Sequence, residues 1–301
     1  MKRGVWLGAA AYSLWGLFPL YWTRVESVPA LEIIAHRIVW SFLVLIVMIL
    51  IAEIRRARRA GSGGVGLLVI SIRPYTIASA LIGLNWYLYV WGVNHGLVVG
   101  TSLGYFITPL VNVLLGVVIL RESLRPAQWL AVAIAAAGVT YLSIAYGSVP
   151  WISLALAGTF GTYGLVKKRA PLPAVSGLTL ETGILFLPAL VYLIVLDVTG
   201  SGAFVHSGLA ITLLLAGAGI VTTVPLLLFA SAAKQIPLSV LGILQYISPT
   251  IQFLLGLFVY REPFTRVQLI GFTTVWIALA VFAVDGGRSA AARIQESAVT
   301  R

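Results

Sequence analysis

Residues 105–122 read YFITPLVNVLLGVVILRE, and residues 245–262 read QYISPTIQFLLGLFVYRE. One pattern therefore occurs twice in this chain, 140 residues apart. Both copies are apolar over most of their length and end in an arginine followed by a glutamate. Repetition on this scale indicates two copies of one structural unit. The positions that are identical in the two copies are Ile107 and Ile247, Pro109 and Pro249, Leu114 and Leu254, Leu115 and Leu255, Gly116 and Gly256, Arg121 and Arg261, and Glu122 and Glu262.

The composition is that of an integral membrane protein. Hydrophobic residues make up 60% of the 301 positions, charged residues 10%, and the mean hydropathy is +1.01. Soluble domains are about half apolar and about a quarter charged. The chain contains no cysteine, which excludes disulfides, thiolate metal sites and cysteine nucleophiles. The net charge of +11 does not indicate nucleic-acid binding, because the basic residues lie in short loops between apolar segments.

Ten apolar segments are each about long enough to cross a hydrocarbon core of ~30 Å. We therefore predict an all-α integral membrane fold with ten transmembrane helices. The predicted segments are 4–22, 31–52, 74–94, 97–120, 127–145, 149–166, 177–196, 208–230, 237–259 and 266–284.

The distribution of lysine and arginine predicts the orientation in the membrane. If the N-terminus is cytoplasmic and the segments alternate, sixteen basic residues lie on the inner side. The outer side then holds three, Arg24, Arg261 and Arg266, and Arg37 lies within a helix. Cytoplasmic loops carry an excess of lysine and arginine. Both termini are therefore predicted to be cytoplasmic.

The repeated Arg-Glu pair predicts that the two copies are inserted in opposite senses. Arg121 and Glu122 end the fourth segment on the inside, whereas Arg261 and Glu262 end the ninth on the outside. Five helices per copy is an odd number, so the second copy enters the membrane upside down. We expect one five-helix repeat at 1–145, an inverted one at 146–285 around a central cavity, and a cytoplasmic tail at 286–301.

The chain resembles the EamA-type drug/metabolite transporter superfamily. The resemblance lies in two inverted five-helix halves, each with a proline thirteen residues before a glutamate. Three further stretches are similar to its RarD branch, whose members are labelled chloramphenicol-sensitivity proteins: SLWGLFPLYW at 13–22, EIIAHRIVWS at 32–41 and GLTLET at 177–182. This resemblance implies a secondary-transport fold in the bacterial inner membrane, a small-molecule substrate and export as the direction.

Ionisable residues within apolar segments are candidate functional residues, because they are costly in a bilayer. Arg37 lies within the second segment, and aligning 29–37 with 173–181 places Glu181 at the matching position of the seventh. We predict that Arg37 positions an anionic group of the substrate and that Glu181 acts in gating or proton coupling. The alternative is that Arg37 reaches the outer interface and that Glu181 pairs with the basic cluster at 167–169.

His36 is a candidate proton acceptor for coupling, because its unperturbed pKa lies in the physiological range. Successive residues on a helix point about 100° apart, so His36 and Arg37 cannot both face a cavity. A structural role for His36 is the alternative. Neither His36 nor the other two histidines has metal-ligand spacing, so no metal site is expected.

Aromatic and amide side chains predict the lining of a cavity for a flat or lipophilic solute. The third segment is dense in aromatic residues, and tyrosine and tryptophan also occur within the first and fourth. Anchoring at the membrane interface is the alternative for such residues. The predicted lining residues besides Arg37 are Tyr12, Trp15, Asn85, Tyr89, Tyr105 and Gln245.

Pro109 and Pro249 lie within the fourth and ninth segments. Each lacks a backbone donor and disturbs the preceding turn, which predicts a kink. A hinge for gating and a static kink are both consistent with this position.

The features together favour a secondary transporter that works by alternating access. An enzyme is not expected, since no helix offers a serine–histidine pair and both aspartates, Asp197 and Asp285, lie at helix ends. A lipid scramblase or a channel is the alternative. GSGG at 61–64 lacks a phosphate-binding lysine, so ATP binding is not expected there, and no cofactor is expected. The energy would come from a proton or other ion gradient or from the concentration difference of the solute itself. The solute, the coupling ion and the oligomeric state do not follow from the sequence.

Overall fold

The computed structural model describes residues 2–60, 72–145, 147, 151–261 and 265–299. Glu262, the second glutamate of the repeated motif, lies outside the described residues. All the secondary structure of the described part is helical, as predicted.

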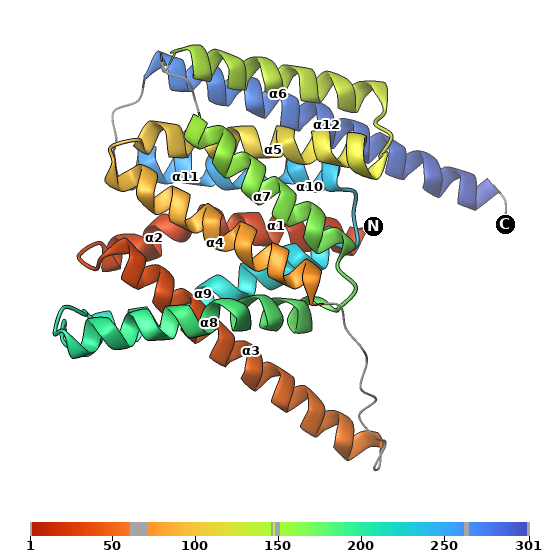
Figure 1. The fold of residues 1–301 in the computed structure, drawn as a ribbon. Coiled ribbons are helices and arrows are strands. Elements are labelled where there is room, and N and C mark those ends of the chain that lie inside the picture. Colours follow the sequence, from red (N-terminus) through yellow and green to blue (C-terminus); the bar gives the residue numbers. More distant parts are fainter. Residues whose placement is uncertain (1, 61–71, 146, 148–150, 262–264, 300–301) are drawn as a thin grey trace.

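The helices follow one another as a bundle of roughly parallel and antiparallel rods (Figure 1). Helix α1 begins and α12 ends at the same end of the bundle. The helices are α1 (Lys2–Gly16), α2 (Phe18–Trp22), the 3₁₀ turn η1 (Thr23–Val25), α3 (Ala30–Ala60), α4 (Arg73–Asn94), α5 (Val98–Leu120), α6 (Pro126–Ala145), α7 (Trp151–Arg169), α8 (Ala174–Val198), α9 (Leu209–Ala233), α10 (Leu238–Leu244), α11 (Ile247–Phe258) and α12 (Arg266–Val299).

Eight segments of the described chain are long and apolar enough to cross a membrane. They lie in α3, α4, α5, α6, α8, α9, the α10–α11 pair and α12. The two other predicted segments coincide with the α1–α2 pair and with α7, so every predicted segment is helical. This confirms the all-α membrane fold.

Two helices extend further than predicted. Helix α3 continues from the predicted end at 52 to Ala60, and α12 continues past 285 to Val299. Both extensions are rich in alanine and arginine, which have high helix propensity. The apolar run therefore covers only part of each helix.

Two of the predicted spans are broken into two helices. The first breaks at Leu17, between α1 and α2, and Pro19 lies in the first turn of α2. The ninth breaks at Gln245 and Tyr246, and Pro249 lies in the first turn of α11. Proline is tolerated in a first turn, where its missing N–H has no intrahelical partner. Pro109, in contrast, lies inside the uninterrupted helix α5.

Contacts between helices follow a reciprocal pattern. Helix α3 packs against α8, α5 against α10, and α6 against α12, and each pair joins matching positions of the two predicted halves. Likewise α1 packs against α9 whereas α7 packs against α4, and α5 packs against α7 whereas α11 packs against α1. Helices α6 and α12 lie side by side along one edge of the bundle (Figure 1). The contact pattern is therefore preserved when the two halves are exchanged.

A glycine sets the closest approach of helices α3 and α9. A Cβ atom at Gly219 would lie 2.5 Å from the backbone carbon and from the Cβ of Trp40. The Ser41 hydroxyl donates a hydrogen bond to the Gly219 carbonyl at 3.1 Å across the same contact. Small residues at helix interfaces allow this close packing in membranes.

We predict that Gly219→Ala lowers the thermal midpoint of the detergent-purified protein, because the added methyl group separates α3 from α9. Overpacking of this kind costs about 1–3 kcal/mol. The matched control is Gly158→Ala in α7, where an added Cβ meets no atom within 4 Å. An equal midpoint for Gly219→Ala and Gly158→Ala would contradict the proposed contact.

Candidate functional site

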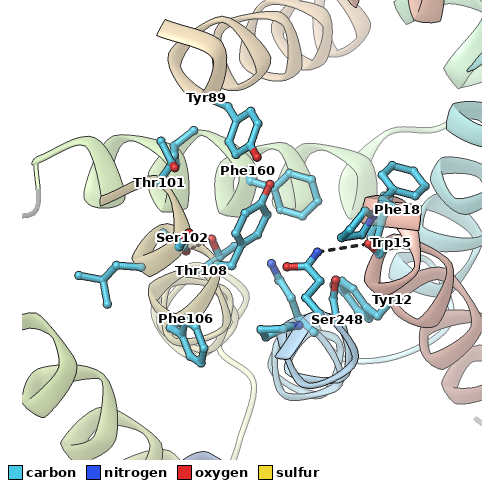
Figure 2. Close-up of a pocket in the computed structure, with 18 of the residues that line it drawn as sticks. Tyr12, Trp15, Phe18, Tyr89, Thr101, Ser102, Phe106, Thr108, Phe160 and Ser248 are labelled. Carbon is cyan, nitrogen blue, oxygen red and sulfur yellow. Dashed lines mark hydrogen bonds between the residues drawn. The ribbon is translucent and has the colours of Figure 1, made fainter. Parts of the chain in front are cut away.

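A cavity of about 520 Å³ lies between the helices of the bundle. Its volume is within the ~300–1,000 Å³ range of small-molecule sites. Its walls come from both predicted halves and include the breaks in the first and ninth spans. Figure 2 shows side chains from several helices directed toward this shared space, among them Tyr12, Trp15 and Tyr89.

The structure brings together the seven residues predicted to bind substrate or line a cavity. All of them contribute to the cavity wall, and so does Pro249 from the gating set. Binding and gating by these residues stay predictions. The seven residues are Tyr12, Trp15, Arg37, Asn85, Tyr89, Tyr105 and Gln245.

Aromatic rings form much of the cavity wall. The Trp15 ring lies 5.5 Å from that of Tyr12 and 5.8 Å from that of Phe160, measured between centroids. Tyr89 and Tyr105 meet edge to face at 6.2 Å. Such rings offer flat apolar surfaces and hydroxyl groups. Phe160 on α7 did not figure in the sequence prediction, because nothing in its segment distinguishes a cavity-facing phenylalanine from a lipid-facing one.

Arg37 is the charged residue among the described lining residues. Its Nε donates a hydrogen bond to the Thr222 hydroxyl at 3.0 Å. Its Cζ lies 4.4 Å from the centroid of the Trp86 ring and 5.1 Å from that of Trp22. The side chain therefore faces the cavity.

Amide groups on α4 and α11 supply further polar atoms. The Asn85 amide donates to the carbonyl of Leu156 and to the hydroxyl of Thr159, both at 2.9 Å, which ties α4 to α7. Gln252 donates to the Trp15 carbonyl at 3.3 Å, next to the break in the first span. The dashed line at Trp15 in Figure 2 marks this hydrogen bond. The Gln252 bond joins the two broken spans to each other.

Gln245 lies where the ninth span breaks. Its Oε1 accepts a hydrogen bond from Asn112 of α5 at 3.0 Å. A Cβ at Gly242 would lie 2.7 Å from the Pro109 carbonyl oxygen, so α10 crosses α5 in direct backbone contact. Pro109 lies at this crossing and not at the cavity wall. The crossing joins α10 to α5, the helix that contains Pro109.

His36 lies outside the cavity, as the angle between neighbouring helical residues requires. Its Nδ1 accepts a hydrogen bond from Trp40 at 3.2 Å, and its ring packs on Phe204 with centroids 4.8 Å apart. Glu32, one turn away, accepts hydrogen bonds from the backbone N–H groups of Ala203 and Phe204. The structure therefore places His36 in a buried contact with the segment that connects α8 to α9.

Glu181 also lies outside the cavity, buried with a basic partner. Its Oε1 accepts a hydrogen bond from Lys167 at 2.7 Å, and its Oε2 accepts one from the Tyr163 hydroxyl at 3.2 Å. The side chains of Lys167 and Glu181 are 2% and 1% exposed. The alternative stated above, pairing of Glu181 with the basic cluster, describes the observed contact.

The repeated glutamate Glu122 closes one end of the bundle. This basic end is where α5, α7 and α9 finish and α10 begins. The two carboxylate oxygens of Glu122 accept hydrogen bonds from the backbone N–H of Leu238 at 2.7 Å and of Ser239 at 2.9 Å, and the Ser239 hydroxyl adds a third at 2.7 Å. Glu122 therefore caps α10 and joins it to α5. Acidic groups are stabilising at helix N-termini.

The other repeated residues explain how Glu122 reaches α10. Arg121 adopts a left-handed conformation with φ of 55°, which turns the chain at the end of α5. Arg261 has the same conformation, with φ of 53°. A Cβ at Gly116 would lie 2.6 Å from the Glu122 carboxylate and 3.1 Å from the backbone nitrogen of Ser239, so a side chain here would displace the carboxylate from its place beside α10. The first copy of the motif is therefore a capping structure, a role that its sequence did not reveal.

Lysines tie α7 to α9 at the basic end. Lys168 donates to the carbonyls of Ala233 and Ile236 and lies 3.9 Å from Glu122, and Lys234 donates to the carbonyls of Ala170 and Leu172. Burial lowers the pKa of Lys234; nearby Lys167 lowers it further and Glu181 opposes the shift. Lys234, Lys167 and Glu181 are therefore close enough to interact electrostatically.

We predict that Lys167→Met and Glu181→Leu each lower the thermal midpoint of the purified protein strongly. Removing one partner leaves the other charge buried without compensation, at about 3–5 kcal/mol. The double variant Lys167→Met/Glu181→Leu replaces both charges by apolar groups and is expected to be more stable than either single variant. Additive losses in the double variant would show that the two charges do not depend on each other.

Comparison with known proteins finds relatives along nearly the whole chain. Residues 2–144 match the model of the EamA-like transporter family. The uncharacterized transporter YojE of Bacillus subtilis is 47% identical over 290 residues, with 93% of each chain covered. Protein RarD of Streptomyces exfoliatus is 42% identical over 305 residues, with 99% of this chain and 95% of that protein covered.

A solved crystal structure shares the fold with a TM-score of 0.69 at 19% identity, covering 92% of this chain and 96% of the other. These relatives confirm the resemblance drawn from the sequence motifs. With the eight apolar helices, they also confirm a multi-pass protein of the bacterial inner membrane.

Proposed function

The chain belongs to the EamA-like transporter family, and we propose that this membrane transporter is a secondary carrier that exports a small organic solute by alternating access. One observation carries the proposal. A cavity large enough for such a solute lies between the two halves, and a set of polar contacts closes the bundle at the basic end.

The lining of the cavity extends toward the end opposite the basic end. It includes Trp22 at the end of α2, Thr101 in the first turns of α5 and Gln268 in the first turn of α12. Among the described residues, the lining omits Glu122, Lys168 and the other groups that join helices at the basic end. Because basic residues face the cytoplasm, the proposed state is closed to the cytoplasm and directed outward.

The inverted repeat gives a reason for a second state. The reciprocal helix contacts and the matching left-handed conformations of Arg121 and Arg261 support two equivalent halves at 1–145 and 146–285. If the halves are equivalent, exchanging their conformations produces a carrier closed at the other end. The proposed second state therefore faces the cytoplasm and uses the same cavity.

Gating is assigned to the contacts that the second state must break. Release of Glu122 from the start of α10 would free the ninth span at the basic end, and the break before Pro249 would let α11 move separately. We place Glu181 in this gate through its pair with Lys167, and not in the cavity. A proton gradient is the proposed energy source.

We predict saturable solute flux in proteoliposomes, sensitive to an imposed pH gradient. The assay presents labelled amino acids, nucleosides, amphenicol drugs and aromatic carboxylates singly. Ser102→Trp is expected to abolish the flux, because Ser102 lines the cavity and a bulky side chain there fills it. Ser102→Ala, the matched control, leaves the volume open and keeps the flux.

The same vesicles distinguish the alternative functions. Transbilayer exchange of fluorescent lipid without solute flux would identify a scramblase. Flux that rises linearly with concentration would identify a channel. Either result would overturn the carrier proposal, as would flux that Ser102→Trp leaves intact.

A further inference from the structure

The cavity carries a positive charge that its described walls do not balance. Arg37 is the charged residue among the described lining residues, and arginine stays protonated in proteins. A cation removed from bulk water is unfavourable unless a partner replaces its hydration. The buried cation Lys167 has such a partner in Glu181. Arg37 forms no ion pair with a carboxylate among the residues that the structure describes.

The contacts of Arg37 orient its guanidinium and leave one edge available. Nε is used by the Thr222 hydroxyl, and the faces of the group lie near the rings of Trp22 and Trp86. Within the described part of the chain, the Arg37 side chain makes no hydrogen bond other than the one from Nε to Thr222. The two Nη groups are therefore the donors that remain. Their parallel N–H bonds match the two oxygens of a carboxylate.

The indole rings make Arg37 a preformed site. Contacts between a guanidinium and aromatic faces are favourable and restrict the side chain. Trp86 in α4 and Trp22 in α2 come from different helices, so the position of Arg37 is set by packing and does not depend on a ligand. A binding group held in place before the ligand arrives loses less entropy on binding.

The rest of the cavity fits an aromatic body, and its described lining offers an ammonium group no carboxylate partner. Trp15, Phe160, Tyr89 and Tyr105 provide ring surfaces. The described lining contains no aspartate or glutamate. A substrate ammonium would therefore lose its hydration without a carboxylate partner and would be repelled by Arg37.

We propose that the substrate is an aromatic monocarboxylate without an amino group, held by the Nη edge of Arg37 and by the aromatic wall. This inference rests on the proposed function, since it takes the cavity as the transport site. It orders ligands by charge: the acid binds most tightly, the neutral alcohol less, and the zwitterionic amino acid and the amine least.

Binding of a matched series to the purified full-length protein tests this order. The probes are 3-phenylpropionate, 3-phenylpropanol, phenylalanine and 3-phenylpropylamine, which share one ring and chain and differ in charge. Hexanoate tests the ring requirement. Tryptophan fluorescence and calorimetry give the dissociation constants. The acid is expected to bind about 10- to 100-fold more tightly than the alcohol, as hydrogen bonds to charged groups allow.

Variants of Arg37 assign the preference to this residue. Arg37→Gln is expected to bind the acid and the alcohol equally, and Arg37→Lys to keep a reduced preference because lysine lacks the planar fork. The matched control is Arg24→Gln, since Arg24 is an exposed arginine of η1 outside the cavity. It is expected to keep the wild-type order.

Several outcomes would overturn the proposal. They are absence of binding by the acid up to its solubility limit, binding of phenylalanine or the amine as tight as that of the acid, and an acid preference that survives in Arg37→Gln. The wild-type series decides the charge order even if the Arg37 variants do not fold. Because binding is measured without vesicles, the order can hold when flux fails, and flux of another solute can occur when the order fails.

Discussion

The structure depends on how it accommodates charges that are withdrawn from water. Few charged side chains lie inside the bundle, and most of these have a partner. Lys167 is paired with Glu181, Glu122 with the start of α10, and Lys168 and Lys234 with backbone carbonyls. These pairings gather at the basic end, where they join α5, α7, α8, α9 and α10. Arg37 is the exception, held by a hydroxyl and two indole rings. One end of the protein is thus fixed by charge pairing, and the cavity retains an unbalanced charge.

The broken helices connect this electrostatic arrangement to movement. In the first and ninth spans the break lies beside the cavity, and proline lies in the first turn of the second helix of each pair. The half of the ninth span before the break is held at the basic end by Glu122, while α11 lies beyond the break. Discontinuous helices at a cavity are a common construction in secondary transporters. The fold therefore combines α10, which Glu122 holds at the basic end, with α11, which has fewer restraints from that end.

Much of the fold was predictable because lipid imposes a simple pattern. Long apolar runs predicted the eight described segments that are long and apolar enough to cross a membrane, and the rarity of charge within such runs singled out Arg37, which does line the cavity. Long-range partners were not predictable. Glu122 was visible as a repeated residue, but the backbone groups that it caps lie 116 and 117 residues away. Glu181 matched Arg37 in alignment, yet its contact with Lys167 turns it away from the cavity. Phe160 had no local signal, because only the packed helices decide which side chains face inward.

We propose that Glu122 holds the basic end closed while the other end is open. Double electron–electron resonance measures distances between spin labels on pairs of engineered cysteines, and it tests this claim directly. The chain has no native cysteine that would also be labelled. One pair, Val118→Cys with Gln235→Cys, reports the basic end, and a second, Ser27→Cys with Val259→Cys, reports the other. Glu122→Gln is predicted to add a longer distance at the basic end and a shorter one at the opposite end, whereas Asp197→Asn, which alters an exposed carboxylate, changes neither. Unchanged distances in Glu122→Gln, or lengthening at both ends together, would contradict the account.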